Sequence, residues 1–286
     1  MECSFWWELH SDGLPNDNGA RIVSVHRADG TPMTLFADVD RLRGIDPVTH
    51  APLADHLELT DTVIVVVIGD VTRTLQITHV ALADEHFWVG TQGRIEGYDI
   101  AYTPLIGAPV SSRVIAFTGD RYDPLDKLVS IGPATDGWIN FACKDGIVYD
   151  MHALGHTTAA QTRLGIATTL SERQSILYAL TMTPCGTGTS FTTLTEPITL
   201  SESQHLLPPT SPLQVMPATY ESIWGPTGAV CLNVPRLANN LVQLGAMIAG
   251  ITAECGAALP ACSTAQIANF PASGHVLTGN PVGSSP

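Results

Sequence analysis

Two histidines have the spacing that could bind a metal ion. His152 and His156 are four residues apart, and this spacing places two imidazoles on one helix face, as in zinc sites. No glutamate follows His152 as it does in a zincin motif, no third ligand is obvious, and the residues before His152 resemble a strand. The pattern therefore favours two partly exposed histidines in a loop over a metal site. The alternative function is a metal-dependent hydrolase that uses these two histidines.

The cysteines favour a covalent framework over a reaction centre. The closest two, Cys255 and Cys262, are seven residues apart, and no second tight pair completes a zinc-binding pattern. We expect disulfides in preference to free buried thiols, although six cysteines allow 15 pairings. A thiolate nucleophile at Cys185 or Cys231 would conflict with this interpretation. The six candidates are Cys3, Cys143, Cys185, Cys231, Cys255 and Cys262.

Other polar groups do not form a recognisable catalytic set. Ser190 lacks the Gly-x-Ser-x-Gly context of a serine nucleophile, and neither a P-loop nor a dinucleotide fingerprint is present. No cofactor is predicted. Clustered carboxylates could bind calcium but match no EF-hand, so we interpret them as solvated turn residues and helix caps. These groups are Asp84, Glu85 and His86, then Asp120, Asp123 and Asp126, and near the start Asp12, Asn16, Asp17 and Asn18.

Composition excludes several classes of partner. The 286 residues carry a formal net charge of -14, and only 14% are charged, against about 25% in typical soluble domains. Binding of nucleic acid or anionic membranes depends on clustered lysine and arginine, so neither partner is expected. No apolar run is long enough for a membrane helix. Residues 1–7 do not resemble a signal peptide, which suggests a processed, mature chain or a cytosolic one.

The residue pattern of the first half of the chain predicts mainly β-strands. Val63 to Ile68 is a continuous apolar run, Gly69-Asp70 is a permitted two-residue turn, and Val71 to Val80 alternates polar and apolar residues. This pattern predicts a hairpin. Further strands are expected at residues 87–89, 98–102 and 113–117.

The second half predicts mixed elements. Residues 138–143 alternate and turn at residues 144–146 into 147–151, which indicates a second hairpin. Residues 190–200 return to β character. One helix is predicted from Ser171, as the N-cap, to Met182, and a longer one from Pro235 to Glu254. The longer helix should pack through one stripe, formed by Leu237, Leu241, Leu244, Ile248 and Ile251.

These elements predict a mainly β, α+β fold. We expect antiparallel sheets or a sandwich, with one long C-terminal helix and one shorter helix. Turn formers concentrate at residues 120–136, which suggests an N-terminal β-rich subdomain over 1–125 and a cysteine-containing α+β subdomain over 126–286.

Short motifs around the cysteines resemble the ADYC-domain family of mostly uncharacterised bacterial proteins, common in myxobacteria and often predicted to be exported. The motifs are FAC at 141–143, CGTGTSFT at 185–192, GAVCL at 228–232, CGAALPAC at 255–262 and LTGNP at 277–281. The name motif Ala-Asp-Tyr-Cys reads Met-Thr-Pro-Cys at 182–185, so only the cysteine is kept. Family cysteines are similarly replaced by Ile106, Met151 and Ile176, and we hypothesise that the first two bridge in relatives.

The resemblance implies export and disulfides but no reaction. We therefore expect a structural or binding protein of the cell surface or extracellular matrix. A non-enzymatic role is favoured over an enzymatic one. The alternative location is the periplasm. Self-association or a surface partner is expected, with a filament or fibre as one form of assembly through strand edges or flexible ends.

Overall fold

The computed structural model describes most of the chain as two compact units. The described residues are 7–38, 41–86, 94–104, 107–123, 128–130, 137–144, 146–157, 168–186, 189–191, 198–202, 220–235, 241–270 and 274–279. The first unit comprises Met1–His86, Gly93–Arg121 and Ile131–Ala153, and the second comprises Phe87–Gln92, Tyr122–Ser130 and Leu154–Pro286. The expected boundary at residues 125 and 126 stays a prediction.

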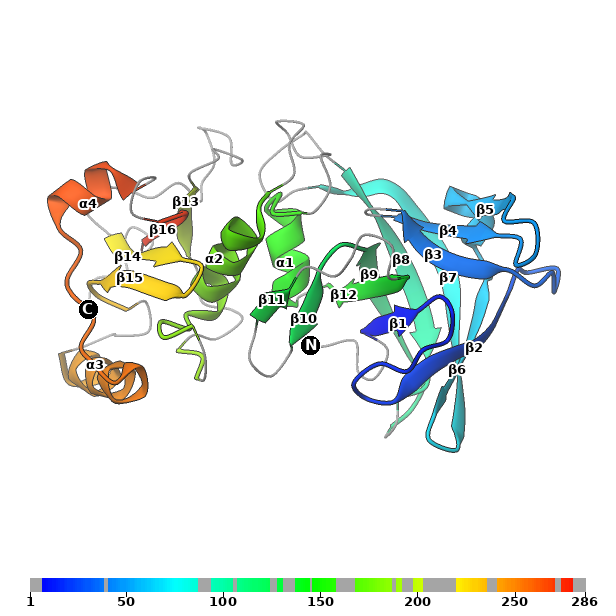
Figure 1. The fold of residues 1–286 in the computed structure, drawn as a ribbon, viewed down its shortest axis with the longest axis horizontal. Helices are drawn as coiled ribbons and strands as arrows, with labels where there is room; N and C mark the ends of the chain where they lie inside the picture. Colours follow the sequence, from blue (N-terminus) through cyan, green and yellow to red (C-terminus); the bar gives the residue numbers. More distant parts are fainter. Residues whose placement is uncertain are drawn as a thin grey trace. The chain divides into compact units, whose positions relative to one another are not determined.

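The fold is mostly β, as the sequence predicts. In the first unit, seven antiparallel strands form one nearly closed sheet in the order β1-β12-β9-β8-β7-β6-β2 (Figure 1). Its strands are β1 (Glu8–His10), β2 (Ala20–His26), β6 (Val63–Ile68), β7 (Val71–His86), β8 (Arg94–Tyr102), β9 (Val110–Phe117) and β12 (Trp138–Cys143).

The predicted hairpin forms the β6–β7 pair. Ile68 pairs with Val71 across the Gly69-Asp70 turn, and the register continues to Val63 opposite Gln76. Gly69 has φ +57°, the left-handed conformation that such a turn requires. The predicted strands at 98–102 and 113–117 lie in β8 and β9, whereas 87–89 falls outside the described residues.

One buried amide joins the two edge strands of this sheet. The Nδ2 of Asn16 donates to the Glu8 carbonyl of β1 at 2.7 Å, and its Oδ1 accepts from the Ala20 amide of β2 at 2.9 Å. The sequence interpretation of Asn16 as a solvated turn residue was wrong, because the sheet curls until β1 and β2 enclose it.

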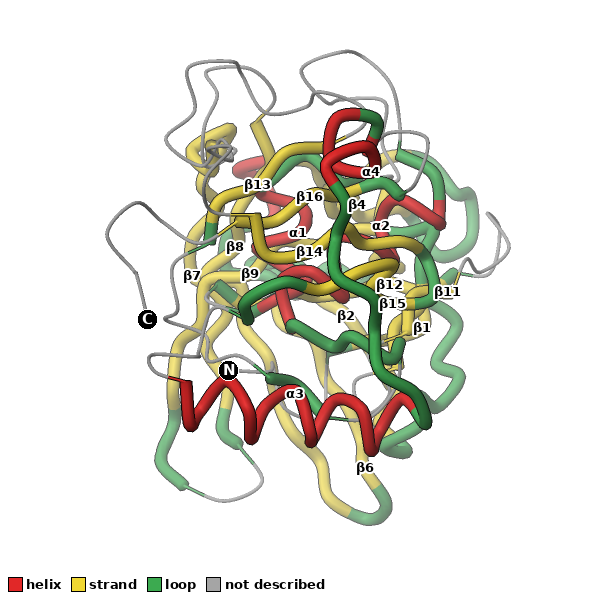
Figure 2. Tube along the Cα trace, turned by 90° about the vertical axis from the view of Figure 1, so that its left-hand side faces the viewer, coloured by secondary structure: helices red, strands yellow, loops and turns green. Residues whose placement is uncertain are grey.

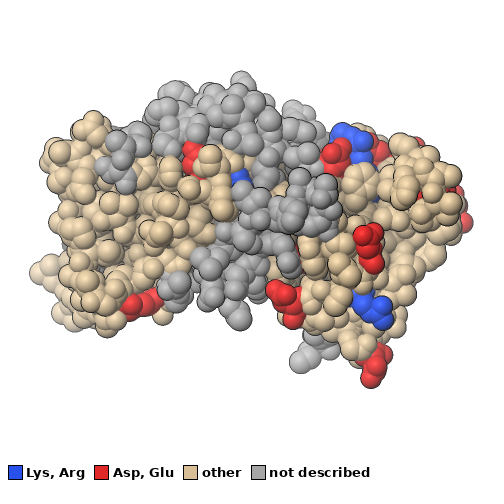
Figure 3. Space-filling view, in the orientation of Figure 1, with Lys and Arg blue, Asp and Glu red and all other residues tan. Residues whose placement is uncertain are grey.

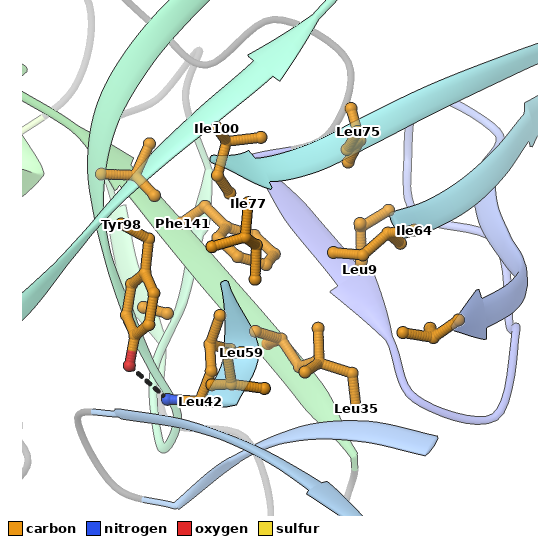
Figure 4. Packing of buried hydrophobic residues seen from close by; sticks show 14 of the residues in the cluster. Leu9, Leu35, Leu42, Leu59, Ile64, Leu75, Ile77, Tyr98, Ile100 and Phe141 are labelled. Carbon is orange, nitrogen blue, oxygen red and sulfur yellow. Dashed lines mark hydrogen bonds between the residues drawn. The ribbon is translucent and has the colours of Figure 1, made fainter. Parts of the chain in front are cut away.

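A smaller antiparallel sheet shares the apolar core of the first unit. It consists of β3 (Thr34–Asp38), β4 (Arg41–Ile45) and β5 (Pro52–Asp55), followed by the 3-10 helix η2 (His56–Leu59). Leu35 and Leu42 lie in one buried cluster with Leu75 of the large sheet. Figure 4 shows the Tyr98 hydroxyl reaching this small sheet, where it accepts from the Leu42 amide at 2.8 Å.

Residues 147–151 form a helix and not the predicted strand. After β12 the chain turns at Gly146 and continues as α1 (Ile147–Ala153). The hairpin prediction was wrong because β12 already pairs with β1 on one side and β9 on the other, so neither of its edges can accept a following strand.

The second unit places one buried helix against a four-stranded antiparallel sheet of order β13-β16-β14-β15. The sheet consists of β13 (Thr199–Glu202), β14 (Tyr220–Gly225), β15 (Gly228–Leu232) and β16 (Val276–Gly279). The helix is α2 (Leu170–Thr181), which also packs against β11 (Leu128–Ser130), the partner of β10 (Arg121–Asp123). Two further helices are α3 (Leu241–Cys255) and α4 (Thr264–Ala268).

Helix α2 matches its prediction in extent but begins with a different cap. Thr169, and not Ser171, is the N-cap: Glu172 Oε2 accepts from the Thr169 amide at 2.7 Å, and the Thr169 hydroxyl accepts from the Glu172 amide. This reciprocal arrangement satisfies two helix N-terminal donors. Ile176 and Leu177 are buried as expected.

No helix in the described part of the chain has both the length and the apolar character needed to cross a membrane.

Candidate interaction surface

Two disulfides fasten the C-terminal segment of the second unit. Cys185, just after α2, bonds to Cys255 at the end of α3, with a Cα–Cα distance of 5.0 Å. Cys231 of β15 bonds to Cys262 before α4, with a Cα–Cα distance of 4.9 Å. Cys143 is also disulfide-bonded, and Cys3 lies outside the described residues. The two bridges anchor the segment 255–262 at both ends.

The segment after α2 forms a tight turn beside the β14–β15 hairpin. Met182 ends α2 in the left-handed conformation, at φ 47°. The Ala229 amide donates to the Pro184 carbonyl at 2.8 Å, and the Phe191 amide donates to the Met182 carbonyl at 2.9 Å. Gly186, near the start of the CGTGTSFT motif, therefore lies beside the GAVCL motif, although the two are about forty residues apart in the sequence.

The C-terminal half of helix α3 contacts the segment that follows α2. Ile251 is buried, and Gly250 lies beside the ring of Phe191. The Thr189 amide donates to Glu254 Oε1 at 2.6 Å, and Cys185 supplies the covalent anchor. Figures 1 and 2 both show α3 apart from the four-stranded sheet of its unit.

The opposite side of α3 is apolar and exposed. We call this side the α3 outer face. The side chains of Leu241 and Val242 are 81% and 83% exposed, and small residues continue the surface toward the C-terminal end of the helix. The face comprises Leu241, Val242, Gly245, Ala246, Ala249 and Ala253.

The prediction for this helix was partly wrong. A helix is present from Leu241 to Cys255, whereas residues 236–240, with Leu237, fall outside the described residues. Ile251 packs inward as predicted, but Leu241 of the same stripe is exposed. Periodicity identifies an apolar helix face, but it does not show whether the chain itself supplies a surface that covers this face.

The α3 outer face carries no charge. From Leu241 to Ala253 the helix contains no Asp, Glu, Lys or Arg, although the whole chain has a net charge of -14. Figure 3 shows few charged side chains at the α3 end of the second unit. Exposed apolar surface of this kind is typical of sites that bind a protein or another apolar surface.

The two predicted histidines do not share a helix face. His152 is buried in the last turn of α1, with its ring centroid 4.0 Å from that of Phe117. His156 follows the end of α1 and is also buried. The described residues contain no group of three or more His, Cys, Asp or Glu side chains arranged to hold a metal ion.

Burial alters the protonation of His156. Loss of solvation lowers the pKa of His156 to about 3; the nearby Glu172 opposes this shift, whereas Arg173 and His275 reinforce it. The imidazole is therefore neutral at physiological pH. The expectation of a partly exposed loop histidine was wrong, because α2 and its neighbours enclose this position.

The predicted carboxylate clusters are only partly within the described residues. Asp120 is buried, and its main-chain carbonyl accepts from the Asn140 side chain, so its interpretation as a solvated turn residue was wrong. The side chains of Asp84, Glu85, His86 and Asp123, and the whole of Asp126, fall outside the described residues. Asp12, Asp17 and Asn18 are exposed as predicted.

The fold and this surface define a mostly β protein with a disulfide-fastened α-helical extension. The ADYC domain family matches residues 56–238, more than half of the chain, and the protein belongs to that family. No curated protein and no solved structure matches it. The match includes Cys185 and Cys231 but ends before α3, so each of the two bridges joins the matched region to the segment beyond it.

Proposed function

We propose that this protein is an exported, non-enzymatic structural or binding protein of the cell surface or extracellular matrix, and that it engages other molecules through the α3 outer face. The observation that carries the proposal is an uncharged apolar helix face left exposed while two disulfides fix the helix and the loop that follows it. A permanently exposed face on an anchored helix suits recognition better than catalysis.

The disulfides support the proposed location. Cross-links of this kind form and persist in oxidising compartments, which include the cell exterior and the periplasm. A 286-residue chain has enough core to fold without them, so two bridges placed around α3 indicate that the position of this helix matters. A filament or fibre would require a second interface in addition to the α3 outer face.

The location can be tested on protein from its natural source. Thiols are blocked with N-ethylmaleimide at lysis, the cytosolic, periplasmic and extracellular fractions are separated, and the mass of the intact protein is measured in each. We expect the protein outside the cytosol with Cys185, Cys231, Cys255 and Cys262 unlabelled. Cytosolic protein with all four thiols labelled would contradict export.

Binding can be tested with two matched variants. Oxidised protein is incubated with isolated cell-envelope and matrix material from the same source, and the bound fraction is measured. We expect Leu241→Glu to reduce binding at least tenfold, because it places a charge on the α3 outer face. Val48→Glu, at a turn position that is also 83% exposed, should leave binding unchanged. Equal binding by both variants would contradict a role for this face.

The alternative of a metal-dependent hydrolase gains no support from the arrangement of its candidate residues. His152 lies inside α1, His156 lies beyond the end of that helix, and both are buried.

A further inference from the structure

The two bridges of the second unit differ in how far their cysteines are enclosed. Cys231 is completely buried in an apolar cluster, and Cys262 packs against the same cluster from a partly exposed position. Cys185 and Cys255 are both partly exposed, and the chain continues beyond Cys255 into the exposed residues 256–258. Solvent therefore reaches both cysteines of one bridge but only one cysteine of the other. The buried members of the cluster are Ile223, Cys231, Phe270 and Leu277.

This difference affects how fast each bridge exchanges with a thiol. A thiolate attacks one sulfur of a disulfide and expels the other as a thiolate, so the access to the first and the surroundings of the second both matter. At the Cys231–Cys262 bridge, attack from solvent is open at Cys262 alone, and it expels a thiolate on Cys231, which apolar surroundings disfavour. At the Cys185–Cys255 bridge, either cysteine can be attacked and either expelled thiolate has access to solvent.

Hydrogen bonds beside the Cys231–Cys262 bridge favour its closed form. The Leu232 amide donates to the Pro260 carbonyl, and the Cys262 amide donates to Asn233 Oδ1, each at 2.9 Å. These bonds do not involve sulfur, so they continue to favour the position of Cys262 beside β15 after reduction. Two thiols that stay close together have a high effective concentration, and the bridge between them re-forms readily.

Helix α3 places Cys255 at the end of a largely exposed element. Ile251 alone among the fifteen residues of α3 is buried. In folded proteins most of the stability of a helix comes from the packing of an apolar face, so a helix with little burial depends more on a covalent bond than a buried strand does. Opening of the Cys185–Cys255 bridge should therefore loosen α3, whereas β15 keeps its place in the sheet.

We propose that the Cys185–Cys255 bridge is a redox switch, which a dithiol opens selectively to release α3 from the turn after α2 while the Cys231–Cys262 bridge stays closed. The dithiol gives up two electrons and two protons as its own sulfur atoms join, and the Cys185–Cys255 bond is replaced by two thiols. The inference rests on the proposed function, because α3 carries the α3 outer face, and it adds a means of control.

The rate of reduction of the folded protein tests the selectivity. Oxidised protein is incubated with dithiothreitol without denaturant, samples are quenched with iodoacetamide, and peptide mass mapping gives the labelled fraction of each cysteine. We expect Cys185 and Cys255 to be labelled about tenfold faster than Cys231 and Cys262. Labelling of all four at one rate, or in the opposite order, would overturn the proposal. In guanidinium chloride the difference should vanish, and a difference that persists there would show that the fold is not its cause.

One variant tests whether the apolar cluster protects the second bridge. Phe270→Ala removes an aromatic ring from the cluster around Cys231 and should speed reduction of the Cys231–Cys262 bridge about tenfold, with Cys185–Cys255 unaffected. Thr264→Ala, at an exposed position of α4, is the control and should change neither rate. Circular dichroism checks that both variants are folded. An unchanged rate in folded Phe270→Ala would contradict protection by burial.

Hydrogen exchange tests the release of α3. In protein alkylated only at Cys185 and Cys255, exchange over residues 241–255 should be about tenfold faster than in oxidised protein, and exchange over residues 228–232 should be unchanged. Unchanged exchange in α3 would overturn the switch. Removal of dithiothreitol without alkylation should restore the slow exchange, and a failure to do so would show that the change is not reversible and also overturn the switch.

Envelope binding by the same samples separates this inference from the proposed function. Oxidised protein should bind, and protein alkylated at Cys185 and Cys255 should bind about tenfold less, because the α3 outer face is no longer held in place. Equal binding by the two forms would show that the bridge does not control this face, and would overturn the proposed control. If the oxidised protein does not bind either, the proposed function fails, whereas the selectivity of reduction is decided by the labelling rates alone.

Discussion

Gly186 and Gly228 face each other at the junction of two cysteine-containing motifs. A Cβ atom on Gly228 would lie 2.7 Å from the Gly186 backbone nitrogen and 2.4 Å from the Pro184 carbonyl oxygen, and Gly228 has φ +118°. A side chain here conflicts both with the backbone conformation and with a neighbouring backbone that cannot move away cheaply. These two glycines permit the turn after α2 to lie against the β14–β15 hairpin.

Gly228→Ala should therefore be among the most destabilising single substitutions in this protein. The backbone conformation alone should cost about 1–3 kcal/mol in free energy of unfolding, and the clash should increase the loss. Gly107→Ala is a matched control, since Gly107 has φ +119° but a Cβ atom there would meet nothing within 4 Å. Urea denaturation measures both, and equal losses for the two variants would contradict the close approach at Gly228.

Asn16 is the basis of a second comparison. Its side chain is buried and bonds to Glu8 and Ala20 on the two edge strands, so Asn16→Ala removes two buried hydrogen bonds that join these strands. We expect a loss of about 2–4 kcal/mol in unfolding free energy. Asn18→Ala removes the same group at an exposed position and should change stability by less than about 0.5 kcal/mol. Similar losses in both variants would show that the amide does not close the sheet.

The elements predicted correctly are those specified by neighbouring residues. The β6–β7 hairpin needed only a Gly-Asp turn between a continuous apolar run and an alternating one, and α2 needed only a local cap and an apolar pattern. Residues 147–151 were predicted wrongly because their conformation depends on β1, which occupies the edge of β12 that a hairpin would use. Strand pairing over more than a hundred residues is not visible in a local pattern.

The candidate surface could be predicted only in part, for a similar reason. The cysteines indicated disulfides, but the pairing of Cys185 with Cys255 and of Cys231 with Cys262 depends on the three-dimensional arrangement. The apolar row of α3 was recognised, yet its orientation depends on the anchors at Phe191 and Cys185, which are distant in the sequence. Conversely, asparagine usually lies at surfaces and histidine is intermediate in burial, so the full burial of Asn16 and His156 results from the fold.

Stability should fall in acid because His156 is buried. Its pKa is lowered from the ordinary 6.5 to about 3 in the folded protein, so between these values the unfolded chain binds a proton that the folded protein does not. The free energy of unfolding should therefore decrease as pH falls below 6.5, by about 1.4 kcal/mol per pH unit for this group. Above pH 6.5 the imidazole is neutral in both states and has no such effect.

His156→Gln should remove this part of the pH dependence. Urea denaturation at pH 7 and pH 4.5 should show a drop that is smaller in His156→Gln than in the wild type by about 2–3 kcal/mol, whatever the absolute stability of the variant. His50→Asn, at an exposed position, should retain the wild-type drop. The same pH dependence in wild type and His156→Gln would mean that the folded protein takes up a proton at His156 near its ordinary pKa.

The two disulfides should have separable effects on α3. Their loops of 70 and 31 residues predict similar losses of about 3.5–4.5 kcal/mol in unfolding free energy in the chain-entropy treatment, so total stability does not distinguish them. Hydrogen exchange distinguishes the two disulfides, because it reports the local stability of each segment. Replacing Cys185 and Cys255 by Ser removes the covalent anchor of α3 and should speed hydrogen exchange over residues 241–255.

The pair Cys231→Ser and Cys262→Ser is the matched control. It should leave hydrogen exchange in α3 nearly unchanged and instead speed exchange near residues 260–262. There the Leu232 amide donates to the Pro260 carbonyl and the Cys262 amide donates to Asn233 Oδ1, each at 2.9 Å. Protected α3 amides in the Cys185→Ser and Cys255→Ser protein would show that noncovalent contacts suffice to hold the helix. Because the α3 outer face needs a fixed helix beneath it, that first double variant should also weaken every interaction made through this face, whereas the control pair should not.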